Sequence, residues 1–530
     1  MFANNLTLCR FILRRDRISI IIWLIVVLAL TVGYGSGLPG MYPSEAERQV
    51  MRETLQNPAM IAMLGPVYDE GGYTIGAMYS NYMLLWSVMI MAIMNIFLVI
   101  RHTRKDEELG RHEVIRSLPV GRMSNLSSTL SVALAVNVLF AVCIGFGLTL
   151  LGETSMGFEG SMLFGAACGA IGMFFASVTA IICQLCGNSS TATGYAFAFF
   201  GVSFIIRAVG DLQSELLACI SPLGLILRIR PYTSDIWWPL FAVLGIALTF
   251  TLIAFRLCSS RDLGAGLLSV RPGSADASRF LNSTYGLAWR LLRTPFIIWT
   301  AVAFMLGASY GSIMGDLEAF IETNEMFRQI FSAMGGQALV EQFISFTMAI
   351  MAIINTIPIL IFTLTARTQE KRGYAENLLS RSVSRFSHLS AYALIAVVAS
   401  VLMPLATAVG FWSASTAVME VPIPLVSFIE SAFIYVPVSW FMIGIAVFLV
   451  AYCPRLTLIV WVLLGYSFFM EYVGSAFKFP AWMLEFNPYH HVPTLGMIDS
   501  SYIGIIILTV ISVVLVAVGF TGYRNCLQFL

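Results

Sequence analysis

Long apolar stretches separated by short clusters of charge form the pattern of this chain. Runs such as 72–100, 123–152 and 502–521 contain no charged side chain. An apolar run of about 20 residues spans the hydrocarbon core of a bilayer as a helix, which satisfies its own backbone polar groups there. The pattern therefore predicts an all-α polytopic membrane protein.

Composition agrees with this pattern, since 58% of the 530 residues are hydrophobic and only 11% are charged. Soluble domains carry about a quarter charged residues. The N-terminal segment lacks an Ala-x-Ala-like cleavage site, so we expect the first run to stay in place. Twelve spans are predicted, near residues 18–38, 76–100, 126–151, 161–186, 191–207, 236–256, 294–314, 343–366, 389–411, 424–452, 456–472 and 502–522.

The positions of Lys and Arg predict the orientation of these spans. Most of the 30 Lys and Arg residues fall in segments 1–17, 101–122, 256–293 and 367–385, which all lie on one side of the membrane. Cytoplasmic segments carry this excess of positive charge. We therefore expect both termini in the cytoplasm.

A charged segment that occurs twice shows that the chain is internally repeated. The sequence EELGRHEVIRSLPVGR (107–122) aligns without a gap with EKRGYAENLLSRSVSR (370–385). A second pair, FGVSFIIRAVGD (200–211) and LGYSFFMEYVGS (464–475), extends the repeat into the spans.

The repeat predicts two six-span units, 1–258 and 276–530, joined by a cytoplasmic linker, 259–275. Because each unit has an even number of spans, the two are parallel and related by an axis along the membrane normal.

Each unit has two further predicted features. Residues 5–17 and 283–293 place arginines opposite apolar residues, which is typical of an interfacial elbow helix at the start of the unit. Residues 215–229 and 479–493 are apolar, short and broken by proline, which favours an outer re-entrant hairpin before the sixth span.

The repeated charged segment follows the second span of each unit and is predicted to form a short cytoplasmic helix. Acidic residues come early and basic residues late, which favours a helix through its macrodipole. Two sets of residues spaced by three fall along one side of that helix: Glu107, Gly110 and Glu113, and Glu370, Gly373 and Glu376. A glycine between two carboxylates leaves room for another surface to approach. A matched pair of such segments suggests a two-fold symmetric partner.

This arrangement resembles the permeases of ABC-2-type transporters. The fused twelve-span form, with RPYTSDIWWPL (230–240) before the sixth span, looks most like the polyketide-antibiotic (tetronasin-resistance-like) exporter permeases. The resemblance implies a bacterial plasma-membrane exporter of a hydrophobic antibiotic, ionophore or lipid-like compound. It also implies that the six residues named above contact a homodimer of a separate ATP-binding-cassette ATPase.

The chain itself is not expected to hydrolyse ATP. A Walker A loop needs a lysine after glycine, and none of the three lysines, Lys105, Lys371 and Lys478, follows a glycine. The glycine-rich SAMGGQ (332–337) is predicted on the outer side. We expect no cofactor and no nucleic-acid partner, with ATP bound by the partner subunit.

Specific residues bear on three other interpretations of the chain. A proton-coupled secondary transporter with twelve spans is the alternative, although few titratable groups lie within the spans. A membrane enzyme could use His490 and His491, but they have no further ligand at metal spacing. Cys183 and Cys186 form a lone CxxC without a second pair, so we interpret them as small apolar residues.

Two intramembrane charges come into register in the repeat. Arg207 of the fifth span aligns with Glu471 of the eleventh, and their surroundings are apolar. Charges in spans usually face a partner or water. Arg207 and Glu471 are therefore predicted to meet between the halves, with outward snorkelling of Arg207 as the alternative.

Overall fold

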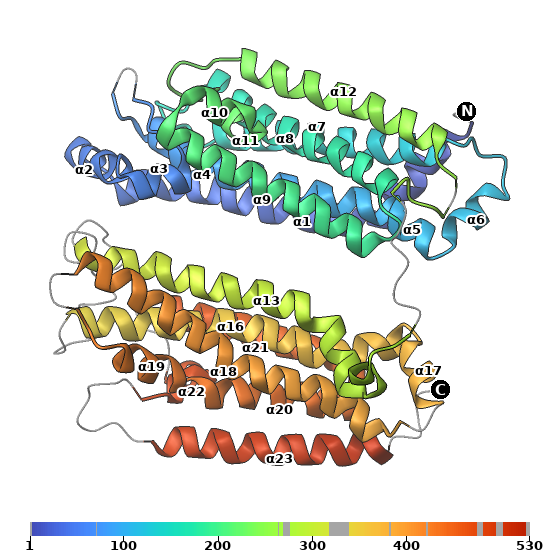
Figure 1. The fold of residues 1–530 in the computed structure, drawn as a ribbon. Coiled ribbons are helices and arrows are strands. Elements are labelled where there is room, and N and C mark those ends of the chain that lie inside the picture. The colour runs from blue at the N-terminus through green and yellow to red at the C-terminus, as the bar shows by residue number, and fades with distance from the viewer. Residues whose placement is uncertain are drawn as a thin grey trace. The chain divides into compact units, whose positions relative to one another are not determined.

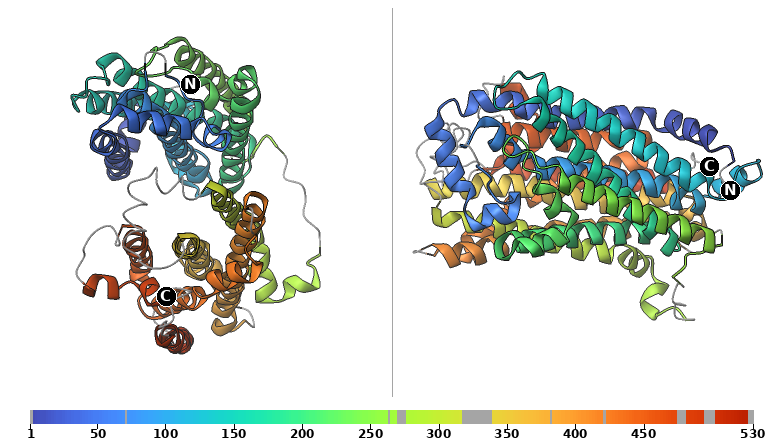
Figure 2. Two further views of the ribbon diagram at one scale, coloured as in Figure 1. Left: turned by 90° about the vertical axis from the view of Figure 1, so that its left-hand side faces the viewer. Right: turned by 90° about the horizontal axis from the view of Figure 1, so that it is seen from above.

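The protein is described from a computed structural model. It covers residues 3–69, 72–262, 264–268, 276–316, 339–380, 383–419, 422–473, 481–493 and 502–525. All secondary structure in these ranges is helical. Twelve helices of this described part are long and apolar enough to cross a membrane, which confirms the predicted fold class. The chain folds as two compact units, 1–272 and 273–530, and Figures 1 and 2 show the helices of each.

The first unit contains six long helices with short helices at their ends (Figure 1). Its elements are α1 (Asn5–Met41), α2 (Glu45–Leu55), α3 (Pro58–Leu64), α4 (Ile75–His102), α5 (Arg104–Glu108), α6 (Arg111–Arg116), α7 (Ser124–Thr149), α8 (Phe158–Leu185), α9 (Ser189–Gln213), α10 (Glu215–Ile220), α11 (Pro222–Leu227) and α12 (Trp238–Ser260).

The second unit follows a similar order. Its elements are η1 (Arg279–Asn282), α13 (Thr284–Gly311), η2 (Ser312–Asp316), α16 (Leu339–Lys371), α17 (Tyr374–Leu379), α18 (Arg385–Val418), α19 (Leu425–Phe433), α20 (Val436–Tyr452), η3 (Pro454–Leu456), α21 (Leu458–Val473), α22 (Ala481–Glu485), η4 (Pro488–His491) and α23 (Ile503–Asn525).

Close helix contacts in each unit depend on a Gly-x-x-x-Gly pair. In α8, a Cβ at Gly165 would lie 2.2 Å from the Ala141 carbonyl oxygen of α7, and Gly169 faces the same helix. In α13, Cβ atoms at Gly307 and Gly311 would lie 2.2 and 2.3 Å from carbonyl oxygens of α18. Without a hydrophobic driving force between helices in lipid, such close backbone approach provides the packing energy.

The expected elbow helices are not separate elements among the described residues. Residues 5–17 begin α1, which runs unbroken for 37 residues, and most of 283–293 lies in α13. No glycine or proline occurs between 5 and 32 to interrupt the helical hydrogen bonds. At about 1.5 Å per residue, α1 is longer than a bilayer core, so its charged start extends past it.

Two other segments differ in detail from the expected spans. The tenth span is broken into α19 and α20, where Pro437 lacks the N–H that would continue the first helix. Residues 215–229 form the short helices α10 and α11, and Leu223 and Ile226 of α11 are fully buried.

Some predicted features lie outside the described residues. They are SAMGGQ (332–337), Lys478, the first two residues of the segment 479–493, and part of the linker 259–275.

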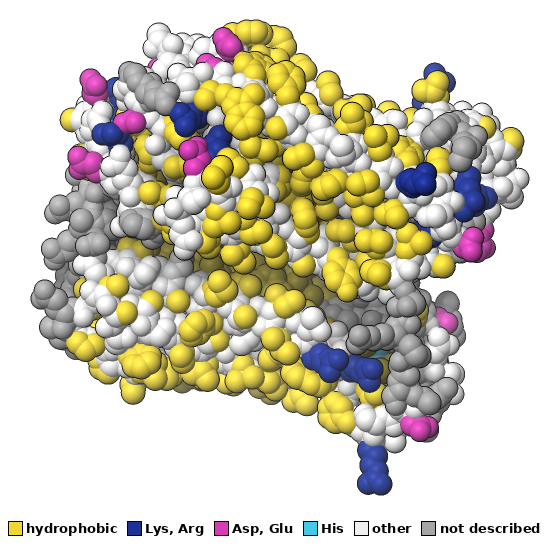
Figure 3. Space-filling view, turned by 45° about the horizontal axis from the view of Figure 1, so that its top comes forward, with side chains coloured by type: hydrophobic (Ala, Val, Ile, Leu, Met, Phe, Trp, Pro, Cys, Tyr) yellow, Lys and Arg dark blue, Asp and Glu magenta, His cyan; other side chains and the backbone are white. Residues whose placement is uncertain are grey.

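The surface separates apolar and charged side chains. Hydrophobic side chains make up much of the visible surface in Figure 3, and most of the charged side chains lie toward its left and right edges. Peripheral helices expose large apolar residues, among them Ile18, Ile25, Leu252 and Val513. A belt of this kind fits lipid, which removes the hydrophobic penalty of exposing these residues.

Candidate functional site

The two copies of the charged segment share one backbone turn. Gly110 has φ 72° and ψ 1° before α6, and Gly373 has φ 73° and ψ 2° before α17. Glycine adopts this left-handed conformation without a steric penalty. The turn separates α5 from α6 and α16 from α17, so the prediction of one helix with three aligned residues is wrong in both copies.

The first glutamate of the first copy points into the unit. Glu107 is only 5% exposed at its side chain, and its carboxylate lies 2.9 Å from both Arg104 and Arg261. It also accepts a hydrogen bond of 2.8 Å from the backbone N–H of Gly264. Because Arg261 directly follows α12, Glu107 joins the segment after the second span to the end of the sixth.

The corresponding glutamate of the second copy makes the same connection with a different donor. Glu370 lies 3.1 Å from Arg367, and its side chain is 23% exposed. It also accepts a hydrogen bond from the hydroxyl of Tyr523, near the end of α23. The first glutamate of each copy therefore links the second and sixth spans of its unit.

The second glutamate of each copy faces solvent. Glu113 lies in the first turn of α6 and Glu376 in the first turn of α17, where the helix dipole favours a negative charge. Exposed apolar residues lie in the same segments: Leu109, Val114 and Leu118 in the first copy, and Tyr374 in the second. Among the four glutamates predicted to contact a partner, Glu113 and Glu376 are therefore the two whose side chains are exposed to it.

An ion-pair network, absent from the sequence-based prediction, holds the first copy to α1. Arg15 donates two hydrogen bonds to Asp106, of 2.5 and 2.9 Å, and Arg111 donates a third of 2.8 Å. Asp16 accepts from His102 at the end of α4. The available signal was the lone acid in Arg-Arg-Asp-Arg (14–17), which suggests a paired rather than a solvated residue.

His112 lies beside this network in α6. Burial, with the charge of Arg116 as a further cause, lowers the pKa of its imidazole below the ordinary value.

Arg207 has its partners within the first unit. Its guanidinium is fully buried and lies 3.4 Å from the carboxylate of Asp211, one helical turn later. It also donates a hydrogen bond of 2.7 Å to the carbonyl oxygen of Ala62. Arg228 also lies 3.3 Å from Asp211. The spacing of Arg207 and Asp211 by four residues was the signal that sequence analysis did not use.

Glu471 likewise has a partner in its own unit, since it accepts a hydrogen bond of 2.9 Å from Asn487. Its pairing with Arg207 across the units stays a prediction.

Near Asn487, His491 lies 2.7 Å from the carbonyl of Glu485. Cys183 and Cys186 are both buried at the end of α8.

Comparison with known proteins places these features in a family. The family model described as "Multidrug efflux system permease Rv1217c, C-terminal domain" matches residues 8–257 and 281–524. The multidrug efflux system permease protein Rv1217c of Mycobacterium tuberculosis (strain ATCC 25618 / H37Rv) is 32% identical over 532 residues, which cover 99% of this chain and 95% of the relative. The chain therefore belongs to the Rv1217c family of multidrug efflux system permeases.

Proposed function

We propose that this chain is the permease subunit of an ATP-driven exporter that moves hydrophobic compounds out of the cytoplasm. A separate ATPase, acting as a homodimer, would bind and hydrolyse ATP. Membership of a family of multidrug efflux permeases supports export of drug-like molecules. Transport of polyketide antibiotics, a bacterial plasma membrane and cytoplasmic termini belong to the same proposal.

One observation carries the proposal: each unit presents an exposed glutamate on a short helix after an identical glycine turn. Two equivalent projections match the two equivalent clefts of a symmetric partner. A force applied to α6 or α17 reaches the sixth span of the unit through Glu107–Arg261 or Glu370–Tyr523. The arrangement thus supports a mechanical link between ATPase movement and the spans.

Glu113→Lys and Glu376→Lys test the proposal, singly and together. Each substitution reverses a charge on the proposed docking surface at an exposed position, so it should not disturb the packing between helices. We expect reduced co-purification of the ATPase and reduced ATP-dependent export, with the double variant most affected. Glu45→Lys is the matched control, because Glu45 is an exposed first-turn glutamate of α2, at the other end of the unit (Figure 1).

Normal ATPase association and export in the double variant would remove the coupling role. Export in vesicles driven by a pH gradient, with no ATPase present, would instead establish a proton-coupled secondary transporter.

A further inference from the structure

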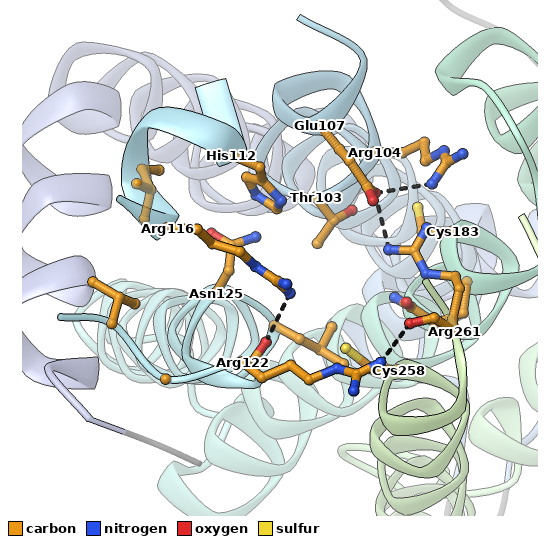
Figure 4. Close-up of a pocket in the computed structure, with 15 residues that line it drawn as sticks. Thr103, Arg104, Glu107, His112, Arg116, Arg122, Asn125, Cys183, Cys258 and Arg261 are labelled. Atoms are coloured by element: carbon orange, nitrogen blue, oxygen red, sulfur yellow. Dashed lines mark hydrogen bonds and ion pairs between the residues drawn. The ribbon is translucent and has the colours of Figure 1, made fainter. Parts of the chain in front are cut away.

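A small cationic cavity lies at one end of the first unit and is lined in part by the charged segment 107–122. It has a volume of about 40 Å³ and lies among α6, the start of α7 and the ends of α8 and α12. Figure 4 shows His112, Arg116, Arg122 and Arg261 arranged around it. At about 10–15 Å³ for each water position, this volume suits a group the size of a phosphate, not a whole nucleotide.

The charges that line the cavity are unbalanced. Four arginines line it, Arg104, Arg116, Arg122 and Arg261, against the single carboxylate of Glu107. Glu107 pairs with two of them, Arg104 and Arg261.

The other two arginines donate to backbone carbonyls. Arg116 lies 3.5 Å from the carbonyl oxygen of Arg122, and Arg122 lies 2.7 Å from that of Arg261. Among the described residues, neither has a carboxylate within ion-pair distance. Each guanidinium has five N–H donors, so both keep donors for a further acceptor.

Buried polar atoms at the cavity also lack partners. Among the described residues, Nε2 of His112 and Nε of Arg104 find no hydrogen-bond acceptor or donor. Arg104 is 1% exposed. A buried polar atom without a partner is costly, so these atoms favour a ligand that supplies one.

The equivalent cavity of the second unit is built differently. It contains Arg367 and Arg385, but also the carboxylates of Glu370 and Glu376. In the gapless alignment of the two copies, Leu379 replaces Arg116 and Ala375 replaces His112. Among the described residues that line it, arginine and carboxylate charges balance, whereas those of the first cavity carry an excess of positive charge.

We propose that the cavity of the first unit binds a phosphate group, held by Arg116, Arg122 and His112. Guanidinium groups recognise phosphate oxygens with paired hydrogen bonds. Basic pockets between the cytoplasmic ends of membrane helices bind the head groups of anionic phospholipids. Free inorganic phosphate offers the same chemistry. A bound phosphate would join α6 to the ends of α8 and α12, and this binding does not depend on the ATPase.

The test uses the purified full-length chain and the variants Arg116→Leu and His112→Ala, which install the residues of the second copy. Native mass spectrometry with phosphatidylglycerol measures lipid binding, and thermal unfolding with added inorganic phosphate measures binding of the free ion. Arg14→Leu is the matched control, because Arg14 is an exposed arginine of α1 away from the cavity.

We expect affinity for at least one of the two probes to fall about tenfold in Arg116→Leu, as removal of a charge-assisted hydrogen bond predicts. His112→Ala should weaken it less, and Arg14→Leu should leave it unchanged. A response to lipid alone identifies a head group, and a response to phosphate alone identifies the free ion. Equal binding of both probes by wild type and Arg116→Leu, or no binding by wild type, would overturn the proposal.

Discussion

Asn95 and Asn137 exchange two hydrogen bonds, of 2.9 and 2.8 Å, between the buried faces of α4 and α7. The second unit has a related contact, in which Asn355 of α16 donates a hydrogen bond of 3.0 Å to the hydroxyl of Thr407 of α18. The sequences around the first asparagine of each pair are similar, MAIMN (91–95) and MAIIN (351–355). In both units, therefore, the second span, which leads into the charged segment, is tied to the third span by a buried polar contact.

The first prediction concerns this contact. Asn137→Ala removes both hydrogen bonds between the two amides and leaves Asn95 with the Met91 carbonyl of its own helix as its acceptor. We expect a loss of about 1 kcal/mol in the free energy of unfolding, the scale measured for hydrogen bonds between membrane helices. Unfolding in mixed micelles measures it. A double-mutant cycle with Asn95→Ala should show coupling, whereas additive effects would mean that the two amides contribute independently.

The second prediction concerns the contact of α7 and α8. Gly165→Ala places a methyl group where only 2.2 Å separates it from a backbone carbonyl oxygen, so the helices must move apart. We expect destabilisation of about 1–3 kcal/mol in the same unfolding assay.

Gly201→Ala is the matched control for that variant. A Cβ at Gly201 of α9 meets no atom within 4 Å. Since alanine favours a helix over glycine by about 1 kcal/mol, this change should be neutral or stabilising. Equal effects of the two substitutions would show that close packing at Gly165 does not matter.

The third prediction concerns the buried ion pair of α9. Arg207→Met leaves the carboxylate of Asp211 buried with Arg228 as its remaining partner, and it removes the donor to the Ala62 carbonyl. Breaking a buried pair costs about 3–5 kcal/mol. Thermal unfolding should show this loss, and Arg207→Met with Asp211→Leu should recover part of it. A variant as stable as the wild type would mean that Arg207 is solvated.

The predicted pair of Arg207 and Glu471 has its own cycle. If the two charges meet, Arg207→Glu and Glu471→Arg each impair export, and the exchanged double variant recovers part of it. The cycle of Arg207 with Asp211 supplies the positive control for coupling. Strictly additive defects for the pair with Glu471 would confine both charges to their own units.

The fourth prediction concerns the link to the last span. Tyr523→Phe removes only the hydroxyl that donates to Glu370, so it should lower the proposed ATP-driven export while the proposed ATPase still co-purifies. Tyr285→Phe is the matched control, because its hydroxyl bonds Ser390 near the start of α18 instead. Loss of ATPase association in Tyr523→Phe would show that the hydroxyl shapes the docking surface itself.

The sequence by itself determined the number of spans and the presence of two copies of the charged segment. Apolar length alone decides whether a segment can cross a bilayer, so the twelve spans were readable from local composition. The glycine of each copy was also visible in the sequence, but it was placed inside a helix. The left-handed turn at Gly110 and Gly373, which excludes most other residues, appeared only in the structure.

Tertiary structure alone decided which way the charges point. Glu107 and Glu113 look equivalent in the sequence, yet Glu107 is drawn inward by Arg261, which lies 154 residues along the chain. Within the first unit, Arg207 likewise contacts Asp211 and the carbonyls of Ile61 and Ala62 in α3, which its place in the sequence did not reveal. Spacing predicts which residues can share a helix face. Which of them is buried depends on the opposite charge that another helix brings within a few ångströms, since a buried charge must be paired.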